Sequence, residues 1–109
     1  MERVTVTRHV AADAASVALL LAVSPDPAEG VTLGAPRRTA TGFTASIQLA
    51  DVAPGAVTGA ITVEPDADGS LLRLVLDTDP GTAARRAERA GGTFLSALVL
   101  QARSRSYAA

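Results

Sequence analysis

The chain has 109 residues, which is the length of one domain, and its 48% hydrophobic and 19% charged residues are typical of a globular protein. The net charge of −1 gives the chain no global field that would attract nucleic acid or an anionic membrane. The absence of cysteine excludes disulfide frameworks, thiol nucleophiles and cysteine-based zinc sites. We therefore expect a single domain over residues 1–109, with no nucleic-acid partner.

From Arg3 to Val10, β-branched residues alternate with polar ones, which predicts a strand with one apolar face. The alternation places Arg8 on the apolar face, beside Val6. A guanidinium there needs an oxygen partner, so Arg8 is either in an ion pair, extended off the strand end, or in contact with the polar end of a ligand. His9, the only histidine, lies on the other face, where we expect it to be exposed.

The segment from Ala14 to Val23 has neither a strand period nor a helix breaker, and Asp13 precedes it as an N-cap. This predicts a short helix, closed by Pro25. The segment is apolar almost all round, so we expect it to be covered on more than one side. Its ten residues are too few to cross a bilayer, and we expect no membrane insertion and a soluble, cytoplasmic protein.

Four further strands are predicted, separated by turn residues. The first, residues 31–39, contains Gly and Pro and is expected to be an edge strand or to carry a bulge. The others are expected over 43–49, 57–63 and 72–77, with a hairpin connection at Pro65–Gly69. Consecutive strands joined by turns indicate an antiparallel meander.

The last element is a helix of about 25 residues, with Asp79 as its N-cap and Pro80 at its first position. The pair Gly91-Gly92 in its middle suggests a bend or a very close approach to the sheet, since each glycine costs on the order of 1 kcal/mol relative to alanine in a helix. At 100° per residue, one stripe of this helix carries small and apolar residues, namely Ala83, Ala87, Gly91, Phe94, Leu98 and Ala102.

Half of the chain's arginines lie on this helix, against a single acidic residue, Glu88. A solvated helix face is the ordinary explanation, and an anionic partner is the alternative, which a salt-dependent affinity would support. The basic residues are Arg85, Arg86, Arg89, Arg103 and Arg105.

The segment Val4–Asp13, running into Val17 and Leu20-Leu21, resembles the opening of the SRPBCC superfamily, which includes START-like domains, polyketide cyclases and the birch-pollen allergen. The closing segment from Leu71 to Tyr107 is also similar to that superfamily. The resemblance implies a shortened α+β helix-grip fold. In it a curved antiparallel sheet of about five strands, with a short N-terminal helix, wraps the long C-terminal helix.

The resemblance also implies an apolar cavity between the sheet and the last helix that binds a small hydrophobic molecule. Arg8 or Gln101 would be its polar anchor, although for Gln101 the ordinary explanation is a hydrogen bond near the exposed helix end. The lining would be Phe43, Ile47, Ile61, Leu74, Phe94 and Leu98.

No residue pattern predicts a catalytic group, a cofactor or a metal site. Asp66 and Asp68 flank a turn, where aspartate is favoured for its hydrogen bonds to the backbone. Two other functions stay open. The chain could be a self-associating module that forms a homodimer through an edge strand or an apolar face, or an enzyme of the cyclase or dehydratase kind.

Overall fold

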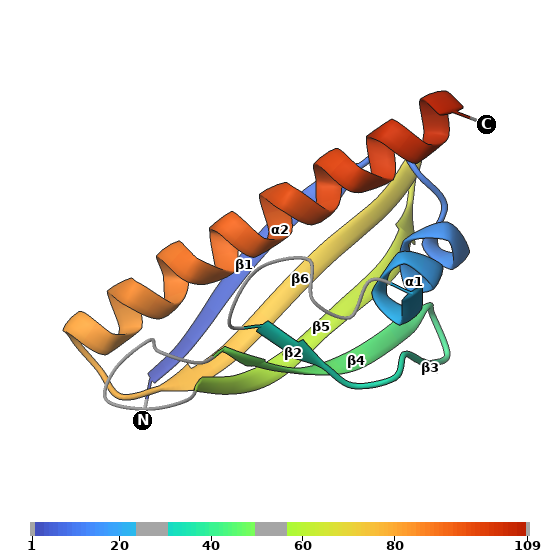
Figure 1. Ribbon diagram of the computed structural model, residues 1–109. Helices are drawn as coiled ribbons and strands as arrows, with labels where there is room; N and C mark the ends of the chain where they lie inside the picture. Colours follow the sequence, from blue (N-terminus) through green and yellow to red (C-terminus); the bar gives the residue numbers. More distant parts are fainter. Residues whose placement is uncertain (1, 24–30, 50–56, 109) are drawn as a thin grey trace.

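The computed structural model describes residues 2–22, 31–49 and 57–103 in full, with the backbone also described for Val23 and for 104–108 (Figure 1). An antiparallel sheet is packed against two helices. The elements in chain order are β1 (Glu2–Val10), α1 (Ala14–Val23), β2 (Val31–Leu33), β3 (Arg37–Arg38), β4 (Phe43–Leu49), β5 (Val57–Asp66), β6 (Gly69–Thr78) and α2 (Thr82–Ala108).

The strands are ordered β1-β6-β5-β4-β2, with β3 paired to β4, and every pairing is antiparallel. The long helix α2 runs along β1 and β6, while α1 packs against β4 and β5 (Figure 1). The α+β class, the meander and the two helices are confirmed.

The core is formed by one face of the sheet together with the inner sides of both helices. In β6 every second residue from Ser70 to Thr78 is buried, as the period of two requires. The register places Val6, Leu74 and Ile61 side by side across three strands. On α2 the buried side chains are Ala84, Ala87, Phe94, Leu95, Leu98 and Ala102, so the stripe expected from the helical period is largely correct.

The predicted start of the last helix is wrong by two residues. Asp79 and Pro80 lie before the helix, which begins at Thr82. Gly81 has φ of 83°, a left-handed conformation that cannot continue into a right-handed helix. Its carbonyl oxygen accepts a hydrogen bond from the N–H of Arg85 at 3.1 Å. Gly81, and not Asp79, therefore occupies the N-cap position of α2.

The expected count of five strands becomes six because the segment 31–39 divides into β2 and β3. Gly34, Ala35 and Pro36 separate the two. The N–H of Gly34 still donates to the backbone carbonyl oxygen of Ser46 at 2.9 Å. Pro36, in contrast, has no N–H to contribute to the hydrogen bonds between strands. The interruption therefore leaves two short strands, both paired with β4.

The bounds of α1 are as predicted, and the helix is largely but not wholly buried. Val17, Leu20 and Leu21 are buried, whereas Leu19 is 58% exposed. α1 contacts β4, β5 and α2, and the side that carries Leu19 is left exposed. Neither helix in the described parts of the chain is both long and apolar enough to cross a membrane.

The glycine pair in α2 serves a close approach to the sheet. A Cβ atom on Gly91 would lie 2.8 Å from Cδ2 of Leu74 and 3.7 Å from Cγ2 of Val6. One on Gly92 would lie 3.3 Å from the guanidinium of Arg8. The approach that the sequence suggested is thus observed, and Gly91 is the residue that allows it.

Asp13 at the start of α1 provides a pH-dependent contribution to stability. The Ser16 hydroxyl donates to its carboxylate, and this bond lowers the pKa of Asp13. A lowered pKa in the folded protein contributes stability above the unfolded value of about 3.9, and the contribution is lost as the pH falls through the folded pKa.

We therefore expect Asp13→Asn to lower the free energy of unfolding by a few tenths of a kcal/mol at pH 7, since the pair is exposed to solvent. The difference between the two proteins should shrink as the pH falls below about 4. Urea denaturation at pH 7 and pH 2.5 measures it, and a difference that is the same at both values would contradict this role.

Candidate functional site

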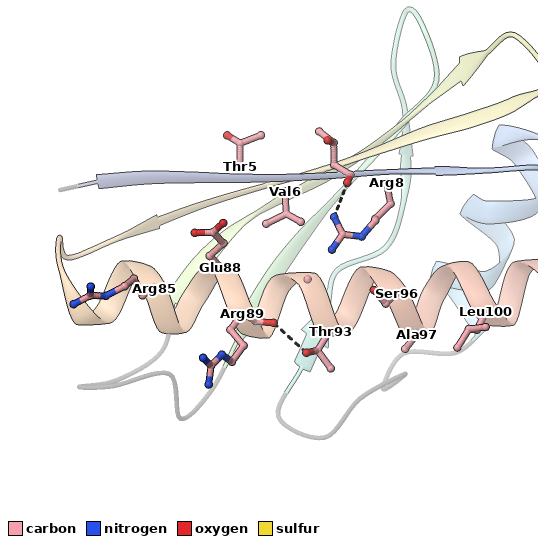
Figure 2. Close-up of a pocket in the computed structure, with 12 residues that line it drawn as sticks. Thr5, Val6, Arg8, Arg85, Glu88, Arg89, Thr93, Ser96, Ala97 and Leu100 are labelled. Atoms are coloured by element: carbon pink, nitrogen blue, oxygen red, sulfur yellow. Dashed lines mark hydrogen bonds between the residues drawn. The ribbon is translucent and has the colours of Figure 1, made fainter.

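A groove lies between the open edge of β1 and the side of α2, with a volume of about 1050 Å³ (Figure 2). One wall is formed by the consecutive residues Thr5 to Arg8 of β1. The other wall is formed by residues of α2 at helical spacing, namely Arg85, Glu88, Arg89, Gly92, Thr93, Ser96, Ala97 and Leu100. The groove is open to solvent along its length.

The groove carries more positive than negative charge. Its lining includes Arg8, Arg85 and Arg89 but only one carboxylate, that of Glu88. Figure 2 shows Arg8 extending from β1 toward α2, and Glu88 extending from α2 toward β1. No ion pair joins these two residues within the described part of the chain. The surplus of two positive charges favours an anionic occupant.

Arg8 is held at the groove by a hydrogen bond to its own strand. Its guanidinium donates to the Thr7 carbonyl oxygen at 2.8 Å, and it lies beside Gly92, where a side chain would crowd it. The residue is exposed, although its neighbours Val6 and Val10 on the same face are buried. Of the alternatives for Arg8, no ion pair is present in the described residues, because the guanidinium bonds to a backbone oxygen of its own strand, and contact with a ligand stays a prediction.

The six apolar residues predicted to line a cavity lie in or against the core. Ile61 and Leu74 are fully buried, Ile47 is 2% exposed, and Phe94 and Leu98 are each 1% exposed. Phe43 is half-buried, at the end of β4. The fold thus brings this set into or against one core cluster, on the face of the sheet that α1 and α2 cover. Their role in ligand binding stays a prediction.

Phe43 also has a polar neighbour. The Arg38 guanidinium lies 5.7 Å from the centre of its ring, within the range of a cation–π interaction. This contact fixes β3 against β4 at the end of the sheet.

Gln101 is half-buried on α2, next to the buried Ala102. Its side-chain oxygen Oε1 is buried and has no hydrogen-bond partner among the described residues. Buried polar atoms in folded proteins nearly always have a partner. The structure therefore places at Gln101 an acceptor that a donor from another molecule could satisfy.

The remaining polar residues form no catalytic or metal-binding arrangement in the described residues. His9 is exposed, as expected, and its Nε2 lies 3.8 Å from a carboxylate oxygen of Asp66 at the hairpin. Nowhere in residues 2–22, 31–49 and 57–103 do three His, Asp or Glu side chains gather at one point. The pair of Asp66 and His9 is an exposed contact between the ends of β5 and β1, the two strands on either side of β6.

The groove itself was not predicted from the sequence. The basic side of α2 pointed toward it, and a second signal was available in the spacing of Arg85, Arg89, Gly92, Ser96 and Leu100 along one side of the helix. Which strand lies beside that side follows from the strand order, which the local pattern does not contain.

Comparisons with known proteins bear on the fold. No protein-family model matches the sequence, and no curated protein matches it significantly. Among solved structures, protein MLL2253 from Mesorhizobium loti matches with a TM-score of 0.64 and 16% identity, covering 95% of this chain and 98% of that chain. Protein CV1439 from Chromobacterium violaceum matches with a TM-score of 0.56 and 14% identity, covering 94% of this chain and 98% of that chain.

A third solved structure, the AHSA1-like protein from Aeromonas hydrophila, has a TM-score of 0.47 and 14% identity, covering 95% of this chain and 90% of that chain. At such identities a likeness shows the fold and leaves the activity open. The two stronger matches extend over nearly the whole of both chains and show that this chain shares their fold. The chain therefore has the expected helix-grip fold, with an antiparallel sheet, a short first helix and a long last helix.

Proposed function

We propose that the protein binds a small, largely apolar molecule between the sheet and α2, and that the amide oxygen of Gln101 accepts a hydrogen bond from it. The observation that carries this proposal is the buried Gln101 oxygen without a partner. A buried polar group left unsatisfied costs about 1–3 kcal/mol, and a ligand with an N–H or O–H group removes that cost. Because Arg8 faces the outer groove, Gln101 is the polar anchor in this proposal.

The way in which α2 is attached to the sheet supports the proposal. Its inner face is apolar, and no hydrogen bond joins an α2 side chain to a strand in the described residues. Apolar contacts are not directional, so α2 can move outward without leaving polar groups unpaired. Phe94 and Leu98 would then move apart from Ile61 and Leu74 and become the walls of the site.

Native mass spectrometry of the protein purified from cells tests the proposal directly. We expect a bound small molecule that is released on denaturation. In parallel, N-phenyl-1-naphthylamine, an apolar fluorophore with one N–H donor, should bind and increase its emission. A ligand-free spectrum together with no fluorescence response would contradict the proposed function.

The change Gln101→Leu separates binding from stability. Leucine has a similar size and no unpaired oxygen, so the free energy of unfolding should rise by about 1 kcal/mol, while the affinity for the fluorophore should fall about tenfold. Gln48→Leu, at an exposed position on β4, is the matched control and should leave the affinity unchanged. An affinity that Gln101→Leu does not alter would show that Gln101 is not the anchor.

A further inference from the structure

The groove beside β1 lies along the edge of a strand. β1 is the end strand of the sheet and pairs only with β6 in the described structure. Thr5 to Arg8 all line the groove, although successive side chains of a strand point to opposite faces. What these four residues share is their backbone edge. Every second residue of such a strand directs its N–H and C=O toward the open side.

The second wall makes this edge a recognisable kind of binding site. The helix α2 overhangs the edge, so an extended chain placed there would pair with β1 through its backbone and contact α2 through its side chains (Figure 2). Strand addition of this kind takes its affinity from main-chain hydrogen bonds and its specificity from the side chains on either side. Four residues of β1 offer a length of about 13 Å.

The charges select the occupant. Arg8, Arg85 and Arg89 outnumber Glu88 in the groove, whereas the chain as a whole has a net charge of −1. A second copy of the chain would bring its own three arginines to the same place, and like charges brought together oppose that pairing. An acidic partner gains from all three. Leu100, which is 63% exposed, adds an apolar contact on the helix wall.

Arg8 protects the edge in the absence of a partner. Its guanidinium occupies the Thr7 carbonyl oxygen at 2.8 Å, and a charged side chain at an edge is a common protection against uncontrolled pairing. A carboxylate competes for the same guanidinium with a stronger, charge-assisted bond. An acidic segment therefore attracts the very group that covers the edge.

From these observations we propose that the groove binds an extended acidic peptide segment of a partner protein, which adds as a strand to the free edge of β1 beside α2. The site is separate from the interior site of Gln101, and either proposal can fail without the other. The acidic side chains of the peptide pair with Arg8, Arg85 and Arg89, and its backbone pairs with Thr5 to Arg8.

Fluorescence anisotropy with a labelled peptide of sequence Glu-Val-Glu-Thr-Glu-Val tests this. We expect saturable binding with a dissociation constant below about 1 mM, weakening as salt is added. The same peptide with lysine in place of glutamate should not bind. Two further peptides carry methyl groups on alternate backbone nitrogens, one on the odd and one on the even residues. Both keep the charge, but the peptide whose methylated nitrogens face β1 cannot pair with it as a strand. The affinity of that peptide should be at least tenfold lower.

Variants of the protein test the side chains. The double change Arg85→Gln and Arg89→Gln should weaken binding of the acidic peptide by up to about tenfold, because exposed ion pairs contribute modestly. Glu88→Gln removes the one opposing charge and should strengthen binding a few-fold, a gain that structural damage would not produce. The matched control is Arg37→Gln with Arg73→Gln, which removes two exposed arginines from β3 and β6 and should have no effect beyond general screening.

Three results would overturn the proposal. Equal binding of the acidic peptide and both methylated forms would show electrostatic adhesion without strand pairing. If the acidic peptide does not bind at 1 mM while N-phenyl-1-naphthylamine still binds, the groove is not a peptide site, and the proposal of an interior site is unaffected. A concentration-dependent dimer in sedimentation experiments that excludes the peptide would show that a second copy occupies the edge.

Discussion

Replacing Phe94 with alanine is expected to lower the free energy of unfolding by about 3–5 kcal/mol. Phe94 is 1% exposed and belongs to the core cluster that joins α2 to the sheet. Its loss removes apolar contacts and leaves a cavity that the surrounding strands fill only in part. The whole stability of a domain is typically about 5–15 kcal/mol, so the variant should be close to its limit of folding.

Urea denaturation followed by circular dichroism measures this loss. Leu100→Ala is the matched control, because Leu100 is on the same helix and 63% exposed. It should change the stability by no more than about 0.5 kcal/mol. If Phe94→Ala and Leu100→Ala gave similar small losses, α2 would not be packed on the sheet through Phe94.

The two neighbouring glycines of α2 are expected to respond in opposite directions to alanine. Gly91→Ala places a Cβ atom 2.8 Å from Cδ2 of Leu74, a fully buried side chain that would have to shift within the core. Overpacking of this kind costs about 1–3 kcal/mol, which exceeds the gain in helix propensity of about 1 kcal/mol. The free energy of unfolding should therefore fall.

Gly92→Ala meets only the guanidinium of Arg8, at 3.3 Å, and that exposed side chain can turn away. The helix propensity gain then dominates, and the free energy of unfolding should rise by about 0.5–1 kcal/mol. Thermal denaturation of both variants under the same conditions checks the difference in sign. Equal effects of the two changes would contradict the close approach of α2 to the sheet at Gly91.

The two proposed binding sites require different positions of α2. An interior ligand needs α2 to move outward from Ile61 and Leu74, whereas a peptide at the edge of β1 needs α2 to stay in place as a wall. We expect an interior ligand to alter the affinity of the groove for the acidic peptide, and by thermodynamic reciprocity the peptide to alter the affinity for the ligand by the same factor.

Much of the fold was readable from local sequence because strands and helices impose their periods on short segments. The alternation around Val4 and Val6, and that of Leu72, Leu74 and Leu76, correctly gave both the strands and their buried faces. Asp13 gave the start of α1. The division of residues 31–39 and the start of α2 were missed. Both depend on the conformation of a few turn residues, Gly81 above all, and composition alone does not specify that conformation.

The candidate sites depended on tertiary structure to different degrees. Local pattern was enough to place Ile47, Ile61, Phe94 and Leu98 on faces that meet, since an apolar face must find another one. It could not show whether those faces close on each other or leave Gln101 without a partner, because that depends on the distance between elements far apart in the chain.

Sequence by itself determined the elements, their order, their inward faces and the basic side of the last helix, because each of these is a property of neighbouring residues. The tertiary structure alone decided that β1 is an edge strand, that Leu19 is exposed, and that Arg8 lines the same groove as Arg85 and Arg89. These facts, including that all three arginines line one groove, follow from the strand order and from the position of α2 over the sheet. Both are set by how all the apolar faces pack at once, and no single segment contains that information.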